Sequence, residues 1–376
     1  VDYVVCEWVS AAYNHDGTLD ETFDEDGWIT VTVPGAAGLY AWPPDNILQP
    51  DGKIIVGGIV VQPDDDIDLA LRRHNPDGAL DEDFGDGGIV VYDFDGEGNY
   101  VENLLLFPDD KILVVGGSGE VIDPFTYTID SGFLLRLNSD GSLDDTFGDG
   151  GKVAWDNDGA GVGPEDLVVT DAGDIFVTGV LGVPADGTQD CGVWRFDSDG
   201  NMDMEFGDAG LLRIDTGRDD SCTSLALLPD GKLAISGFVA PAAEGRQANS
   251  SRMRDRSANA GRSAQAGETQ DALVVRVNAD GTLDETFADS GMLVYDIDES
   301  DNSGPMTAAQ PDGKILVFGN VFDAETETLD FAISRFLGDG PAARVMLPVI
   351  VGGQAGTAVN LEDTAIQAVA RQQGIP

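Results

Sequence analysis

The chain of 376 residues has few basic side chains, few cysteines and no long apolar run. Twenty lysines and arginines stand against 69 aspartates and glutamates, which gives a formal net charge of -49. Such a surface repels the phosphate backbone of nucleic acids, so we expect no nucleic-acid partner. The longest apolar runs, such as Val345–Val351, are far shorter than the roughly 20 residues of a membrane-spanning helix. We therefore expect no membrane span.

The three cysteines are Cys6, Cys191 and Cys222. None lies in a Cys-x-x-Cys pair and none has a histidine nearby, which argues against a zinc site. One disulfide and a leftover thiol would suit a secreted protein. Cys191 and Cys222 fall at strand-like positions in successive parts of the sequence, so we predict that these two pair.

The 49 glycines and many short β-branched runs favour turns and strands over helices. One pattern, Asn/Asp-x-Asp-Gly-x-Leu/Met-Asp-x-x-Phe, recurs five times and is called the turn motif below. Most copies lie about 60 residues apart. In order along the chain, the motifs are Asn14–Phe23, Asn75–Phe84, Asn138–Phe147, Asp197–Phe206 and Asn278–Phe287.

A second element, the hairpin turn, lies between the motifs and reads Pro-Asp-Gly-Lys, with glycine supplying the positive φ of a tight turn. Its copies are Pro50–Lys53, Pro108–Lys111, Asp171–Asp174, Pro229–Lys232 and Pro311–Lys314. An arginine also recurs, two residues before the later motifs and in the last repeat (Arg73, Arg136, Arg195, Arg276 and Arg335). We predict that these arginines pair with motif aspartates, because an unpaired buried arginine is costly.

Four strands in each repeat, joined by tight turns, are typical of a propeller blade. Together the two elements resemble the delta-60 repeat, a β-propeller module of bacterial exported and surface proteins. The resemblance covers Val4 to about Leu337 and implies a fold and an extracellular or cell-surface location, but no particular reaction. The sequence departs from it at Asp197, at Asp174 and in the long fourth interval.

The predicted fold is an all-β propeller of four-stranded blades across residues 1–341, with an Arg-rich insertion at 240–270. Val4–Tyr13 reads as the last strand of an incomplete blade. Ala343–Val351 and Thr357–Leu361 read as strands that would complete it, giving six blades. Five blades with extra strands are the alternative. The rest of the segment 342–376 ends in a short helix over Glu362–Gln373.

Paired motif aspartates are candidate calcium ligands, since calcium prefers carboxylate and carbonyl oxygens. The alternative is that each carboxylate accepts backbone N–H bonds of its own turn. The candidates are Asp16, Asp20, Asp77, Asp81, Asp140, Asp144, Asp199, Asp203, Asp280 and Asp284. Calcium is thus the one cofactor that the sequence suggests. His15 and His74 read as exposed turn residues, and no catalytic constellation is recognisable, so we expect no enzyme.

The sequence favours a structural protein that self-associates, as a filament or coat. The insertion holds five of the twenty basic residues, Arg246, Arg252, Arg254, Arg256 and Arg262. Its best partner would be the acidic surface of another copy. An incomplete closing blade would also offer an unpaired edge to a neighbour's strand. Two alternatives remain open: a propeller that binds sugar or protein ligands, and a propeller lyase or hydrolase.

Overall fold

A computed structural model describes most of the chain. The described residues are 8–31, 38–62, 66–94, 98–107, 109–123, 126–127, 129–157, 159–182, 189–240, 270–288, 290–295, 301–323, 328–336 and 345–347. These residues form strands and turns, with no helix among them. A search of the same residues for a helix able to cross a membrane finds none. The chain divides into two compact units, Val1–Pro164 and Glu165–Pro376, each described by itself.

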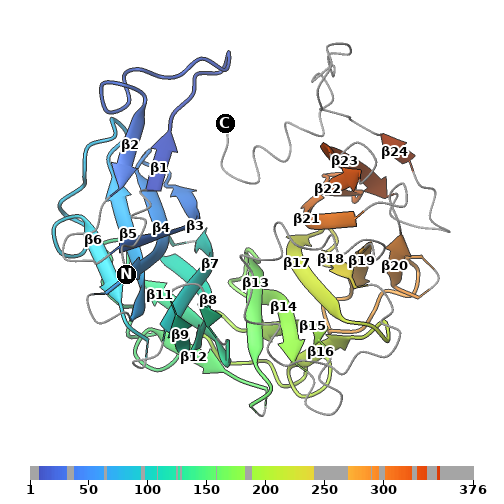
Figure 1. Cartoon of the computed structure of the whole chain (residues 1–376). Helices are drawn as coiled ribbons and strands as arrows, with labels where there is room; N and C mark the ends of the chain where they lie inside the picture. Colours follow the sequence, from blue (N-terminus) through green and yellow to red (C-terminus); the bar gives the residue numbers. More distant parts are fainter. Residues whose placement is uncertain are drawn as a thin grey trace. The chain divides into compact units, whose positions relative to one another are not determined.

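Unit 1 contains two four-stranded antiparallel sheets, a two-stranded sheet and a small hairpin (Figure 1). The two-stranded sheet pairs β1 (Trp8–Ala11) with β2 (Trp28–Val31). The next sheet contains β3 (Gly38–Leu48), β4 (Ile54–Val61), β5 (Ile67–His74) and β6 (Ile89–Tyr92). The third contains β7 (Gly98–Leu106), β8 (Ile112–Gly119), β11 (Ser131–Leu137) and β12 (Lys152–Trp155). The hairpin pairs β9 (Val121–Asp123) with β10 (Thr126–Tyr127).

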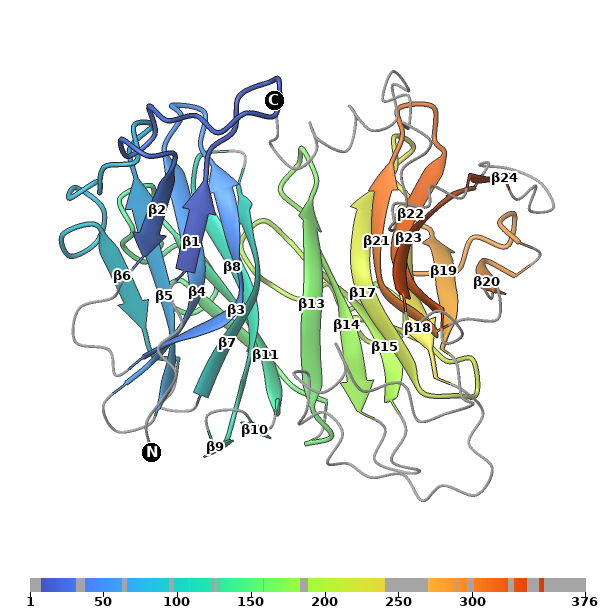
Figure 2. The ribbon, with the colours of Figure 1, turned by 45° about the horizontal axis from the view of Figure 1, so that its top comes forward.

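Unit 2 contains three four-stranded sheets, seen edge-on in Figure 2. The first contains β13 (Val162–Val169, whose first residues precede the boundary), β14 (Ile175–Gly182), β15 (Gln189–Phe196) and β16 (Leu211–Ile214). The second contains β17 (Asp220–Leu227), β18 (Leu233–Val239), β19 (Asp271–Val277) and β20 (Met292–Tyr295). The third contains β21 (Asp301–Ala309), β22 (Ile315–Asp323), β23 (Thr328–Phe336) and β24 (Val345–Leu347).

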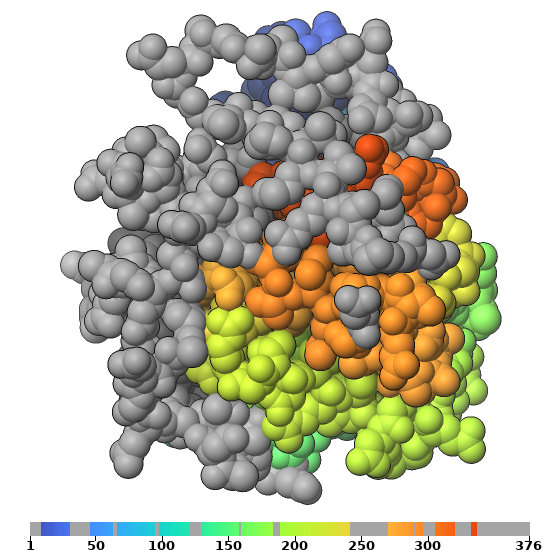
Figure 3. Space-filling view, turned by 90° about the vertical axis from the view of Figure 1, so that its right-hand side faces the viewer, coloured from blue at the N-terminus to red at the C-terminus, as the bar shows by residue number. Residues whose placement is uncertain are grey.

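Each hairpin turn joins the first two strands of a sheet, and each turn motif joins its last two. Because neighbouring strands are antiparallel, both elements lie at the same end of the sheet, called the turn end here. The opposite end is called the loop end. Successive motifs also contact each other: the Gly207 amide donates to the Asp280 carbonyl at 3.2 Å. The outer face of unit 2 in Figure 3 shows the orange fifth-motif segment beside the yellow-green fourth-motif segment.

The hydrophobic core lies between adjacent sheets, as expected for a propeller. Every motif phenylalanine is buried, and three of them show its place. Phe84 packs in a cluster with residues of the β3–β6 and β7–β12 sheets, including Leu71 and Val114. Phe206 and Phe287 hold the corresponding places in clusters of unit 2. The motif therefore fixes both a turn and the contact between neighbouring sheets.

The predicted disulfide is confirmed. Cys191 of β15 is bonded to Cys222 of β17, with their Cα atoms 5.2 Å apart. Both residues are fully buried. The bond thus joins two neighbouring sheets of unit 2 near their loop ends.

Three details differ from the sequence predictions. The N-terminal segment supplies two strands, because Trp8–Ala11 pairs with Trp28–Val31 across the first motif. Val345–Leu347 pairs with β23 and completes its own sheet, where β23 would otherwise present an open edge. His74 is buried and its Nδ1 lies 2.8 Å from the Gly78 carbonyl, so it is no exposed turn residue. Ring closure stays a prediction. The expected helix and Thr357–Leu361 lie outside the described residues.

Candidate ligand site at the fourth turn motif

The motif aspartates mainly hold their own turns. In the first motif, Asp16 Oδ1 accepts the Thr18 amide at 3.0 Å and Asp20 Oδ1 accepts the Thr22 amide at 3.0 Å. Equivalent bonds reach Asp77, Asp81, Asp140, Asp144, Asp203, Asp280 and Asp284. Asp199 is the exception, and donates its amide to Asp197 Oδ1 at 3.0 Å. None of the ten candidates belongs to a group of three close carboxylates within the described chain. Calcium binding by them stays a prediction.

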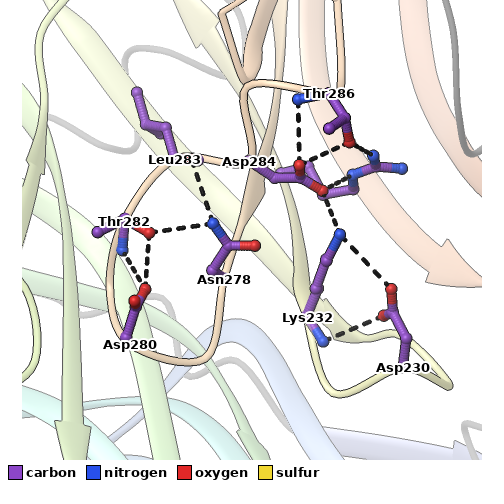
Figure 4. A network of polar contacts seen from close by, with 9 residues as sticks. Asp230, Lys232, Asn278, Asp280, Thr282, Leu283, Asp284 and Thr286 are labelled. Atoms are coloured by element: carbon purple, nitrogen blue, oxygen red, sulfur yellow. Dashed lines mark hydrogen bonds and ion pairs between the residues drawn. The ribbon is translucent and has the colours of Figure 1, made fainter.

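In three repeats the second motif aspartate also holds two cations. Asp284 Oδ2 accepts both Lys232 Nζ and Arg276 Nε at 2.6 Å, the first of these contacts being visible in Figure 4. The lysine comes from the hairpin turn and the arginine from the end of the third strand. The same Lys–Asp–Arg network recurs as Lys53–Asp81–Arg73 and Lys111–Asp144–Arg136, with contacts of 2.6 to 3.0 Å. The predicted arginine–aspartate pairs are confirmed for Arg73, Arg136 and Arg276. The prediction fails for Arg335, whose Nε is buried without a hydrogen-bond partner within the described residues.

These networks are buried and change the proton affinity of their carboxylates. The side chains of Arg73, Arg136 and Arg276 are 3 to 7% exposed, and those of their aspartates 5 to 6%. Burial raises the pKa of Asp284, but the hydrogen bonds from Lys232 and from Thr286 outweigh it and leave the pKa well below its ordinary value. Burial likewise raises the pKa values of Asp81 and Asp144, but hydrogen bonds, among them those from their own lysine and arginine partners, lower them by more. All three carboxylates are therefore ionised in the folded chain at neutral pH.

The fourth repeat breaks this network. Asp174 occupies the position of the hairpin-turn lysine, so two carboxylates face one arginine. Arg195 Nη2 lies 3.2 Å from Asp174 Oδ2, and its Nη1 lies 3.1 Å from Asp203 Oδ2. The Arg195 side chain is 28% exposed and that of Asp203 is 29% exposed, several times more than their counterparts. Replacing a single lysine thus opens the polar centre of this repeat.

The other departure in the fourth motif is compensated locally. Asp197 stands where the other motifs have asparagine, and Asn201 stands where they have a threonine, serine or alanine. The Asn201 side-chain amide donates to Asp197 Oδ2 at 3.0 Å. In the fifth motif the donor is instead Asn278, which reaches the Thr282 hydroxyl at 3.0 Å (Figure 4). The fourth turn therefore keeps its shape, and its open centre results from Asp174.

A cavity of about 660 Å³ lies at this open centre, at the turn end of unit 2. It is lined by the hairpin turns of all three sheets of the unit, together with Arg195 from β15. Its polar side chains are Thr170, Asp171, Asp174, Arg195 and Gln310. Its size and mixed lining fall in the range of small-molecule sites. Within the described chain, Gln310 Oε1 is buried without a hydrogen-bond partner.

A second polar group lies at the loop end of unit 2. Carboxylate oxygens of Asp190, Asp215 and Asp220 come within 4.8 Å of one another, although the three residues lie on different strands or loops. The disulfide tethers β15 and β17 beside Asp190 and Asp220. Arg213 Nε is paired with Asp190. In unit 1, Asp66, Asp68 and Asp93 form a similar group at the loop end.

Burial makes Asp190 an unusually weak acid. The residue is 1% exposed, and this burial raises the pKa of its carboxyl to about 6, although Arg213 opposes the shift. Burial also raises the pKa of Asp220, against the hydrogen bonds from Thr216. Asp190 can therefore exchange a proton near neutral pH.

Neither of these sites was predicted from the sequence. The signal for the cavity is Asp174, which departs from the lysine of the other hairpin turns. An aspartate at the start of a third strand and another just after a fourth strand, as at Asp190 and Asp215, was the signal for the loop-end group. The predicted interface arginines, Arg246 to Arg262, lie outside the described residues.

Within the described residues, four-stranded antiparallel sheets that carry the repeated turn motif define a β-propeller. The family model described as "Domain of unknown function (DUF5122) beta-propeller" matches residues 49–84, 108–147 and 260–287. Each matched segment ends at a motif phenylalanine. The match supports assignment of the chain to the β-propeller repeat proteins. No curated protein matches the chain.

Several solved structures are similar to the chain over most of its length. An α-L-arabinanase of Penicillium chrysogenum complexed with arabinobiose is 13% identical, with a TM-score of 0.47, over 84% of this chain and 82% of that one. A polysaccharide lyase, an ulvan lyase in its bound form, is 15% identical, with a TM-score of 0.49, over 85% and 74%. An α-L-arabinofuranosidase mutant of Fusarium graminearum is 11% identical, with a TM-score of 0.49, over 84% and 82%. At these identities the similarity concerns the fold alone.

The prediction of a non-enzymatic structural protein that self-associates is corrected. The solved structures named above are those of an arabinanase, a lyase and an arabinofuranosidase, and none of the three is described as a filament or coat protein. One physical premise also fails, since Val345–Leu347 is already paired with β23. That segment is a strand of its own sheet, so it is not free to complete a neighbour's.

Proposed function

We propose that the chain is an extracellular propeller of delta-60-type repeats that binds a saccharide in the turn-end cavity of unit 2. One observation carries the proposal: the cavity lies where Asp174 replaces a lysine and leaves Arg195 partly exposed. Sugar hydroxyls both donate and accept hydrogen bonds, which suits a carboxylate beside a guanidinium and an amide. The buried disulfide supports an oxidising compartment outside the cytoplasm.

Calorimetric titration of the full chain with glucose, galactose and glucosamine tests this proposal. We expect at least one of them to bind the unchanged protein, and Asp174→Lys to abolish the binding, because the new lysine would restore the network found in the other repeats. The matched control is Asp208→Lys, which makes the same charge change at an exposed position of the same sheet. Equal binding by both variants would place the ligand elsewhere.

A second candidate function, acid–base chemistry on a polysaccharide, is favoured by Asp190. A carboxyl with a pKa of about 6 next to other carboxylates is a group able to donate and accept protons near neutral pH. Incubation with soluble polysaccharides, scored for new reducing ends, tests this candidate. Activity that Asp190→Asn removes and Asp174→Lys leaves unchanged would assign the chemistry to the loop end.

A further inference from the structure

We infer that the ligand of the turn-end cavity carries a primary ammonium group, as an unacetylated amino sugar does. This inference rests on the proposed function and adds the chemical class of the ligand. Its basis is a difference between repeats of the same chain. In three repeats a hairpin-turn lysine completes the Lys–Asp–Arg network, and in the fourth Asp174 takes the place of that lysine.

In the three completed repeats, the carboxylate equivalent to Asp203 binds a primary ammonium. The lysine Nζ lies 2.6 Å from Asp284, 2.7 Å from Asp81 and 3.0 Å from Asp144. These lysine side chains are only about one quarter exposed. The framework formed by the hairpin turn, the strand-end arginine and the motif aspartate is therefore an ammonium-binding arrangement in the three repeats that have both the lysine and the motif aspartate.

In the fourth repeat this arrangement has an excess of negative charge. Asp174 and Asp203 share the Arg195 guanidinium. Asp171, Asp174 and Arg195 line the cavity, and Asp203 lies behind Arg195 as its second partner. Arg195 contacts Asp203 through Nη1 at 3.1 Å, whereas the buried arginines make a 2.6 Å contact through Nε. The looser pairing leaves carboxylate oxygens able to accept hydrogen bonds from an ammonium.

The rest of the cavity favours a hydroxylated ligand over a simple alkyl amine. A volume of about 660 Å³ is suited to a small molecule with several polar groups. Thr170 and Gln310 add a hydroxyl and an amide to its lining. An amino sugar combines the ammonium with several hydroxyls.

Calorimetric titration of the full chain with glucosamine, glucose, N-acetylglucosamine and Nα-acetyl-lysine amide tests the inference. We expect glucosamine to bind at least about tenfold more tightly than glucose or N-acetylglucosamine, which is the effect of one charged hydrogen bond. Equal affinities for glucosamine and glucose would overturn the ammonium assignment and leave saccharide binding intact. Equally tight binding of the lysine amide would overturn the amino-sugar assignment. Binding of none would overturn both the inference and the proposed function.

Two conservative variants test whether Asp174 and Asp203 cause the preference for glucosamine over glucose. Asp174→Asn and Asp203→Asn keep the side-chain shape and remove one negative charge each. We expect both to reduce the preference for glucosamine over glucose to less than about threefold, because an ammonium loses more than a hydroxyl when a carboxylate becomes an amide. Asp208→Asn is the control that should keep the full preference. An undiminished preference in both variants would overturn the assignment.

Discussion

At the scale of single residues, one aspartate in each completed repeat compensates a buried arginine and a partly buried lysine. Such pairs add little net stability over an apolar core, but removing one partner is costly because the others stay buried and charged. The fourth repeat provides the comparison within the same chain, since Asp203 is partly exposed and its arginine has Asp174 as a second partner. The same substitution should therefore have different costs in different repeats.

Asp284→Asn should lower the free energy of unfolding by about 3–5 kcal/mol, because Arg276 and Lys232 lose their shared carboxylate. Asp203→Asn should cost less than about 1 kcal/mol, as expected for a solvent-screened ion pair. Urea unfolding of the two variants measures the difference. Equal costs would show that burial of the network contributes nothing.

The pH dependence of stability should reveal Asp190. Its folded pKa of about 6 lies above the ordinary value of 3.8, so the folded state binds the proton more tightly. The contribution of protonated Asp190 to the free energy of unfolding is thus fully present below about pH 4 and is lost as the pH rises towards 6. The loss amounts to about 3 kcal/mol at most. Asp190→Asn should flatten the melting temperature between pH 4 and pH 6, whereas Asp208→Asn, at an exposed position outside this carboxylate group, should retain the slope.

At the scale of elements, the sequence patterns predicted the features that are set by residues close together in the chain. The turn motif, the hairpin turn and the burial of Phe84 or Phe206 follow from turn chemistry and apolar spacing. The disulfide was also predicted, because Cys191 and Cys222 fall at strand-like positions in successive repeats. The turn motif and the hairpin turn could be recognised because each recurs several times along the chain.

What the sequence could not provide depends on contacts between distant segments. The cavity needs the hairpin turns of three sheets, and only their arrangement shows that Asp174 leaves Arg195 open. The Asp190–Asp220 group depends on strand register and on the disulfide between sheets. The burial of His74 likewise depends on packing that turn chemistry alone does not predict.

Replacing Cys191 and Cys222 together with serine should lower the free energy of unfolding by about 2–4 kcal/mol, since the bond closes a loop of 31 residues and joins two sheets. Urea unfolding of the oxidised chain and the double variant measures this. Dithiothreitol should destabilise the unchanged protein and leave the double variant unaffected. Equal sensitivity of both to the reductant would contradict a stabilising role for this bond.

If the motif carboxylates are saturated by their own turns, a chelator should leave the melting temperature unchanged. Asp16 and Asp20 illustrate the reason, because each already accepts an amide and a hydroxyl of the residue two positions on. Thermal melts in calcium and in EDTA, at matched ionic strength, make the comparison. A lower midpoint in EDTA would instead support calcium as a structural cofactor.

At the scale of the whole molecule, the net charge of -49 is the main electrostatic term that opposes folding. Like charges repel across the folded surface, and salt screens exposed charges more strongly than buried networks. Raising sodium chloride from 0.05 to 0.5 M should therefore raise the melting temperature. A falling melting temperature would mean that the Lys–Asp–Arg networks are screened more than the surface repulsion.

The most direct test of the account is a crystal structure of the full chain soaked with glucosamine. The account predicts density for the sugar in the turn-end cavity, with its ammonium beside Asp174 and Asp203 and its hydroxyls near Gln310. Density at the loop-end carboxylates, or an unchanged cavity with the sugar bound at another surface, would contradict it.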